Sequence, residues 1–88
     1  MLISLPPGYA NARQLRIPIQ NSISLRDALE IASATVEFLR ALLEGNGTTA
    51  DGTFLLLLNG KKVAIEQATD ILVSDRDELV IIPPILGG

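Results

Sequence analysis

Only one segment of this 88-residue chain has the period of a long helix, and this limits the folds that the chain can adopt. The segment begins after Ser24, a good N-cap residue, carries Asp27 in its first turn, and ends near Glu44. Its apolar residues recur every three or four positions: Leu25, Leu29, Ala32, Val36, Leu39 and Leu43. The predicted helix is about 30 Å long. One such helix can cover only one face of a sheet.

Most of the remaining chain has strand character. The predicted strands are residues 1–5, 14–20, 54–58, 61–65 and 79–83. Pro18 has no N–H for a ladder, so the second strand should lie at a sheet edge. Asn59 and Gly60 form a hairpin turn signal, and the connection after the hairpin has room for one helical turn. The order predicts a single α+β domain, with one long helix packed on a small mixed sheet.

Two of these strands are apolar at both parities. A sheet covered on one face normally alternates apolar and polar residues, but residues 54–58 and 79–82 do not. Each aliphatic side chain left in water forgoes roughly 1.5–3 kcal/mol of burial. We therefore predict a partner surface on the uncovered face. Alternatively, a long loop or a second copy of the chain covers it. The pattern does not choose the outward side of residues 54–58.

Composition excludes several classes of protein. The chain has no cysteine or histidine, which removes disulfides and cysteine metal sites. Its net charge is −3, with basic residues scattered along the sequence, so nucleic acid is not an expected partner. If charge guides an encounter, the total favours a partner with a basic surface. No apolar run approaches the roughly 20 residues that span a bilayer, and a soluble cytoplasmic protein is expected.

The sequence offers little catalytic machinery. A serine triad would need Lys61 or Lys62 as its base, next to a turn where an amine is solvated. The acidic residues Asp75, Asp77 and Glu78 surround one turn and are more typical of a solvated loop or recognition patch. They also lack the spacing of a calcium loop, so no metal site is predicted.

The chain ends in an unusual sequence, "IIPPILGG". Pro83 and Pro84 stop sheet pairing and hold the chain extended, so that residues 85–88 project from the body. Four extended residues reach roughly 13 Å. The two terminal glycines lack a Cβ and can thread a narrow channel, while Ile85 and Leu86 can anchor just outside it.

The order of elements, the "LLLLNGKKV" hairpin and the "DELVIIPPILGG" ending resemble the ubiquitin-like sulfur carriers of the MoaD/ThiS type, which have the β-grasp fold. The ending is most similar to the small subunit of molybdopterin synthase. The resemblance implies a β-grasp domain over residues 1–84 and a flexible diglycine tail over residues 85–88. The chain departs from the family at Arg76, where glycine is usual, and in its first strand and longer helix.

In this family an activating enzyme adenylates the terminal glycine with ATP, and sulfur then displaces AMP to give a thiocarboxylate. The resemblance therefore implies that Gly88 carries the reacting group and that Ile85, Leu86 and Gly87 thread the partner's active site. The alternative fate of Gly88 is conjugation to a lysine, as in a ubiquitin-like protein modifier. If the native chain extends past Gly88, a pure interaction module remains possible.

The resemblance also implies partners. These are a ubiquitin-activating-type adenylyltransferase, similar to MoeB or ThiF, and a large catalytic subunit such as a MoaE-like protein. A gap-free alignment of the diglycine ends places Leu79 and Ile81 in the core, with Val80 and Ile82 outward as the docking surface. No cofactor is expected to be bound permanently, since the activating enzyme uses the ATP. The resemblance implies a carrier that is non-catalytic by itself and serves as the small subunit of a sulfurtransferase, molybdopterin synthase. The resemblance favours sulfur delivery for molybdenum cofactor biosynthesis. Sulfur delivery for thiamine or cysteine synthesis is the alternative.

Overall fold

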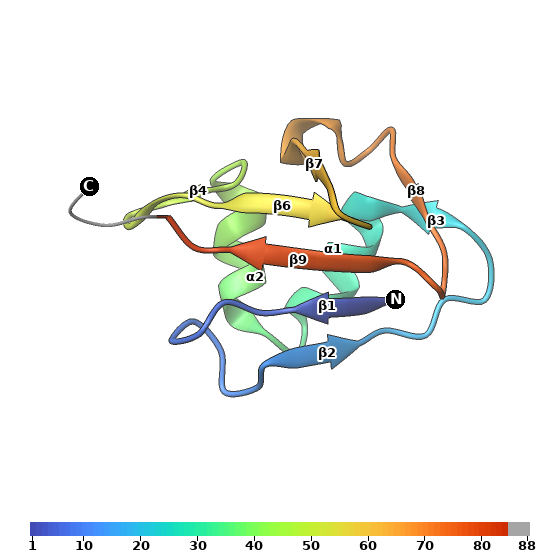
Figure 1. Ribbon diagram of the computed structural model, residues 1–88, viewed down its shortest axis with the longest axis horizontal. Helices are drawn as coiled ribbons and strands as arrows, with labels where there is room; N and C mark the ends of the chain where they lie inside the picture. The colour runs from blue at the N-terminus through green and yellow to red at the C-terminus, as the bar shows by residue number, and fades with distance from the viewer. Residues whose placement is uncertain (85–88) are drawn as a thin grey trace.

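The chain folds around one five-stranded mixed sheet (Figure 1). The computed structural model describes residues 1–84, so the predicted tail over residues 85–88 lies outside the described part. In spatial order the strands are β2 (Gln14–Arg16), β1 (Leu2–Ser4), β9 (Glu78–Ile82), β6 (Leu55–Leu58) and β7 (Lys61–Val63). β1 and β9 are parallel, and the other neighbours are antiparallel. The last strand along the chain is therefore the central strand of the sheet.

Each predicted strand has a counterpart in the five-stranded sheet, although the ladders are shorter than predicted and the strand predicted over residues 61–65 ends at Val63. β2 lies at a sheet edge, as Pro18 requires, although its ladder ends at Arg16 and is shorter than the predicted strand. Beyond it Ile17 and Ile19 are buried and Pro18 is exposed, so the alternation typical of a strand continues to Ile19. In the β6–β7 turn, Asn59 and Gly60 have φ angles of 51° and 83°. Two successive positive φ angles define the tight hairpin turn that an Asn-Gly pair favours.

The prediction of one long helix is wrong, because two helices occupy the segment. α1 spans Leu25–Ser33 and α2 spans Glu37–Glu44. The predicted N-cap is confirmed, since Ser24 Oγ accepts a hydrogen bond of 3.0 Å from the N–H of Asp27. The chain leaves helical geometry before α2, where Val36 has an extended backbone with φ −118° and ψ 101°.

The residues at the break explain it. Thr35 and Val36 are adjacent β-branched residues, which lose side-chain freedom in a helix. The break also lets two short helices follow a twisted sheet while the apolar stripe stays inside. All six residues of that stripe are buried, with exposures between 0% and 9%. The hydrophobic pattern thus predicts the buried residues correctly, but not the interruption between them.

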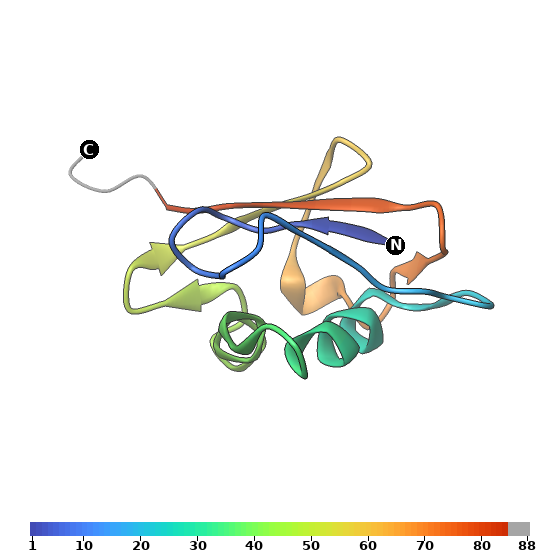
Figure 2. The same ribbon diagram turned by 90° about the horizontal axis from the view of Figure 1, so that it is seen from below.

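Three smaller elements complete the fold. β3 (Ile23–Ser24) pairs with β8 (Leu72–Val73), and β4 (Thr48–Thr49) pairs with β5 (Gly52–Thr53). A short 3₁₀ helix, η1, spans Ile65–Gln67 and is the helical turn expected after the hairpin. Figure 2 shows α1, α2, η1 and both small ladders on one side of the five-stranded sheet. Within residues 1–84, neither helix is long and apolar enough to cross a membrane.

Candidate docking face and tail exit

The uncovered side of the sheet carries an apolar strip along its two central strands. On β9, Leu79 and Ile81 are buried at 0% and 2% exposure, whereas Val80 is 37% exposed and Ile82 is half-buried. The predicted facing of these four residues is therefore confirmed. Their role in docking stays a prediction.

Strand register identifies the other half of the strip. Leu57 lies opposite Val80 and Leu55 lies opposite Ile82, and both leucines are half-buried. Directly opposed residues share a face, so Leu55, Leu57, Val80 and Ile82 form one surface, called here the outer strip. This settles the side of residues 54–58 that the sequence left open.

The outer strip leads directly to the predicted tail. Ile82 is followed by Pro83 and Pro84, both half-buried, and Pro84 lies against Gly52 of β5. A Cβ built on Gly52 would be 3.0 Å from Cβ of Pro84, and the φ of Gly52 is +126°, a conformation that favours glycine. A side chain at Gly52 would therefore displace Pro84. The sequence does not predict this contact, because Gly52 and Pro84 are far apart in the chain and meet only in the folded protein.

The hairpin that supports Pro84 is itself held to the body. The hydroxyl of Tyr9 donates a hydrogen bond of 3.0 Å to Oδ2 of Asp51, at the tip of the β4–β5 hairpin. Tyr9 also packs with Phe38 and Phe54, and the three ring centroids are 5.0 to 5.1 Å apart. The hydrogen bond to Asp51 raises the pKa of Tyr9, with burial and the negative charge of Asp51 adding to the effect. The last described residues thus rest on a braced hairpin.

At its other end, β9 begins from the acidic turn. Asp77 accepts hydrogen bonds from Asn59 Nδ2 at 2.9 Å and from the N–H of Ser74 at 2.7 Å, and the Ser74 hydroxyl lies at 3.3 Å. The bonds from Asn59 and Ser74 lower the pKa of Asp77. Asp75 accepts the N–H of Ile19 at 3.0 Å, and this bond, with the charge of the Met1 amine, lowers the pKa of Asp75. The acidic turn therefore has a structural role that its sequence did not reveal.

Replacing Asp77 with alanine should destabilise the fold, because its carboxylate joins the turn before β9 to the β6–β7 turn. We expect the free energy of unfolding at neutral pH to fall by about 1–2 kcal/mol, the lower part of the range for charged hydrogen bonds because the site is half-exposed. The pKa of Asp77 is lowered by folding, so its contribution is present above the unfolded pKa of about 4 and is lost as pH falls through the folded pKa.

Urea unfolding of both proteins at pH 7 and in acid measures this effect. The difference between wild type and Asp77→Ala should shrink in acid. Asp70→Ala is the matched control, since no side-chain hydrogen bond of the exposed Asp70 is found among the described residues. A loss in Asp77→Ala that persists undiminished below its folded pKa would contradict the assigned role.

The described residues contain no group of three acidic, histidine or cysteine side chains placed to hold a metal ion. A groove of about 640 Å³ lies between the β1–β2 loop and the start of α2, away from the outer strip. The structure thus brings together Val80 and Ile82 with Leu55 and Leu57. The other predicted site residues, Ile85 to Gly88, lie outside the described part.

Two helices on one face of a mixed sheet, with parallel β1 and β9 at its centre, define a ubiquitin-like β-grasp protein. The sequence matches the ThiS family over residues 18–88, and the chain belongs to this family of ubiquitin-like sulfur carriers. The crystal structure of SAMP1 from Haloferax volcanii is similar, with a TM-score of 0.68 and 22% identity over 99% of this chain and 97% of that one. At that identity the likeness shows the fold alone. No curated protein matches the sequence significantly.

Proposed function

We propose that this chain carries sulfur as a thiocarboxylate on Gly88. The observation that carries the proposal is the continuity of β9. In a chain of the ThiS family, an uncovered apolar strip runs directly into a proline pair and a diglycine ending. One strand thus contributes both a surface for a partner and the stem of the reactive end. Carriers of this kind generally work with activating enzymes of the E1 type.

The chemistry follows from the carboxylate. An anionic carboxylate is a poor electrophile, so one of its oxygens first attacks the α-phosphorus of ATP, and pyrophosphate leaves. A sulfur nucleophile on a partner then attacks the carbonyl carbon of Gly88, and AMP leaves with the C–O bond electrons. The attacking atom is the outer sulfur of a persulfide, so the product is an acyl disulfide; a thiol of the partner then attacks the donor sulfur, forms a disulfide with it, and the thiocarboxylate leaves with the electrons of the broken S–S bond. The hydrogen-bond donors that stabilise the transition states of these steps belong to the partner, an adenylyltransferase similar to MoeB or ThiF. We propose a cytoplasmic location, supported by the absence of cysteine from the sequence.

For the recipient pathway we propose molybdenum cofactor biosynthesis. The support is the similarity of "DELVIIPPILGG" to the ending of molybdopterin synthase small subunits. The partner in this role is a large catalytic subunit of the MoaE type, which receives the tail in its active site. Val80 and Ile82 then contribute to docking, while Ile85, Leu86 and Gly87 thread the active site.

Intact mass of protein purified from its native host tests the proposal. A thiocarboxylate is heavier than the carboxylate by the difference between one sulfur and one oxygen atom, and Gly88 deletion should remove the heavier species. Isopeptide adducts at lysines of other proteins, without that species, would instead support a protein modifier that uses the same activated glycine. A population with neither product would contradict both functions.

A further inference from the structure

The strand register places one charged side chain beside the outer strip. Lys62 of β7 lies opposite Leu57, which lies opposite Val80, which lies opposite Ser4 of β1. These residues form a single row across the sheet, with about 5 Å between neighbouring Cβ atoms. The stem of a lysine can lie along Leu57 while its ammonium group stays in water. Lys62 is therefore a cationic border of the outer strip.

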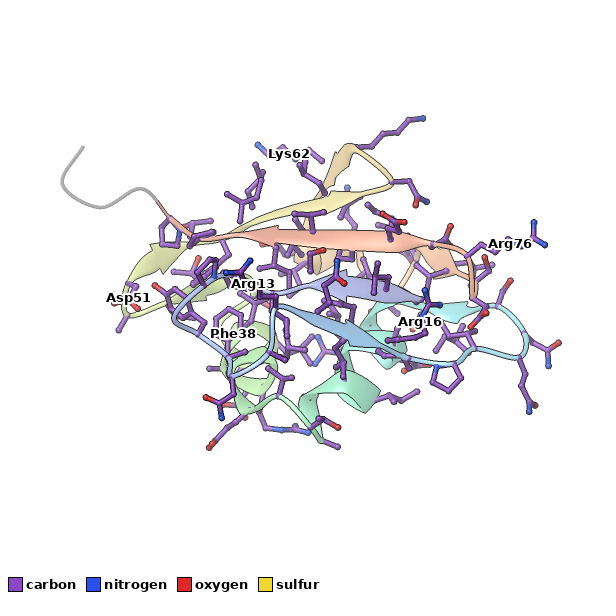
Figure 3. The ribbon with its side chains drawn as sticks, turned by 60° about the horizontal axis from the view of Figure 1, so that its bottom comes forward. Arg13, Arg16, Phe38, Asp51, Lys62 and Arg76 are labelled. Carbon is purple, nitrogen blue, oxygen red and sulfur yellow. The ribbon has the colours of Figure 1, made fainter. Side chains whose placement is uncertain are left out.

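Charge is distributed unequally between the two sides of the molecule. The helices α1 and α2 carry four acidic and two basic residues: Asp27, Glu30, Glu37, Glu44, Arg26 and Arg40. By register, the charged residues on the uncovered sheet face are Lys62, Arg16 and Glu78. Glu78 is in the neighbouring row with Arg16, so the row of Lys62 has no carboxylate. Figure 3 shows Lys62 and Arg16 on opposite edges of the sheet.

From this geometry we infer that the outer strip docks a protein surface with an apolar centre and a carboxylate placed to meet Lys62. The inference rests on the proposed function and specifies the chemistry of its partner. It reverses the expectation drawn from the net charge of −3, because the local charge at the contact, rather than the total, steers close association. The partner carboxylate should lie about 10 Å from the atoms that cover Val80.

The hairpin contains a matched control for this inference. Lys61 is adjacent to Lys62 and also exposed, but it lies opposite Leu58 of β6. Leu58 in turn lies opposite Leu79 of β9, which is buried under the helices. The two lysines therefore point to opposite faces of β7. Lys61→Glu and Lys62→Glu change the net charge equally and differ only in the face that they alter.

The experiment measures ATP–pyrophosphate exchange with the E1-like adenylyltransferase of the same organism. For Lys62→Glu we expect KM for the carrier to rise about 3- to 10-fold at low salt, with kcat unchanged and a smaller effect at high salt. Lys61→Glu should stay close to wild type, and Lys62→Gln should be intermediate. Equal responses of the two glutamate variants, or no rise for Lys62→Glu, would overturn the inference while leaving the carrier function intact.

A second measurement does not need the enzyme. An anionic gadolinium chelate should enhance the relaxation of amides near Leu57 and Val80 more than a neutral chelate does, and Lys62→Glu should remove the difference. Equal relaxation in the wild type would overturn the inference.

Two further results would also overturn it. One is self-association of the chain that Lys62→Glu abolishes, and the other is binding to vesicles of anionic phospholipid that depends on Lys62. An absence of exchange with the wild-type chain would instead contradict the proposed function.

Discussion

Adding one residue after Gly88 should abolish adenylation of the chain. The extra residue moves the terminal carboxylate by about 3.5 Å, whereas a misplacement of about 1 Å can already cost a hundredfold in rate. Deletion of Gly88 should also abolish adenylation, because it withdraws the terminal carboxylate by about the same distance. ATP–pyrophosphate exchange with the activating enzyme is the measurement, and we expect a loss of at least about a hundredfold in both variants.

Docking is the control for these variants. It should survive extension and deletion, because Val80 and Ile82 are unchanged in both. Gly87→Val examines the narrow channel separately, since its branched Cβ should hinder threading without altering the terminal carboxylate. Undiminished ATP–pyrophosphate exchange with the extended chain would contradict both the carrier and the modifier function, and the chain would then be a small binding domain.

Aspartate substitutions at neighbouring positions of β9 should have opposite consequences. Ile82→Asp should weaken partner binding by more than tenfold, which is about 1.4 kcal/mol, and leave the domain folded. Ile81→Asp should unfold it, because a carboxylate would replace a side chain that is only 2% exposed. An unpaired buried charge costs about 4 kcal/mol or more, a large part of the stability of a small domain.

Circular dichroism reports the fold of both variants, and titration calorimetry with the partner reports binding. Val80→Asp should behave like Ile82→Asp, since both residues belong to the outer strip. A folded Ile82→Asp variant that binds with wild-type affinity would remove the outer strip from the docking surface.

The sequence predicts a large part of this fold because its signals are local. Ser24 caps its helix through its own side chain, and Asn59 with Gly60 closes the hairpin by backbone preference alone. The edge position of β2 follows from the chemistry of Pro18, which no distant contact alters. The helix break differs, because the stripe continues through Thr35 and Val36 with almost unchanged spacing. Hydrophobic period marks which residues are buried, but a short interruption leaves that period nearly intact.

The features of the site that the sequence missed depend on residues far apart in the chain. Gly52 meets Pro84 only after the β4–β5 hairpin folds back toward the end of β9. The sequence indicates a solvated loop or a recognition patch around Asp77, whereas its carboxylate accepts a hydrogen bond from Asn59, which lies 18 positions earlier. The side of residues 54–58 needed register, because every residue in that segment is apolar. Pairing with β9 decides the side of this segment, and the pairing of β6 with β7 then gives the face of Lys62.

The position of β9, which is part of the outer strip and precedes the C-terminal residues in the sequence, affects how tightly a partner has to be bound. β9 carries half of the outer strip, and Gly88 is only a few residues further along the sequence, so the proposed docking would bring the C-terminal segment close to the partner. After docking, entry of the C-terminal glycine into the active site is an intramolecular step. Short flexible connections give such steps effective concentrations in the millimolar range. The outer strip then does not need high affinity. In the proposed function, weak docking with rapid release would be enough to present Gly88, and the chain would then move from the enzyme that loads it to the enzyme that unloads it.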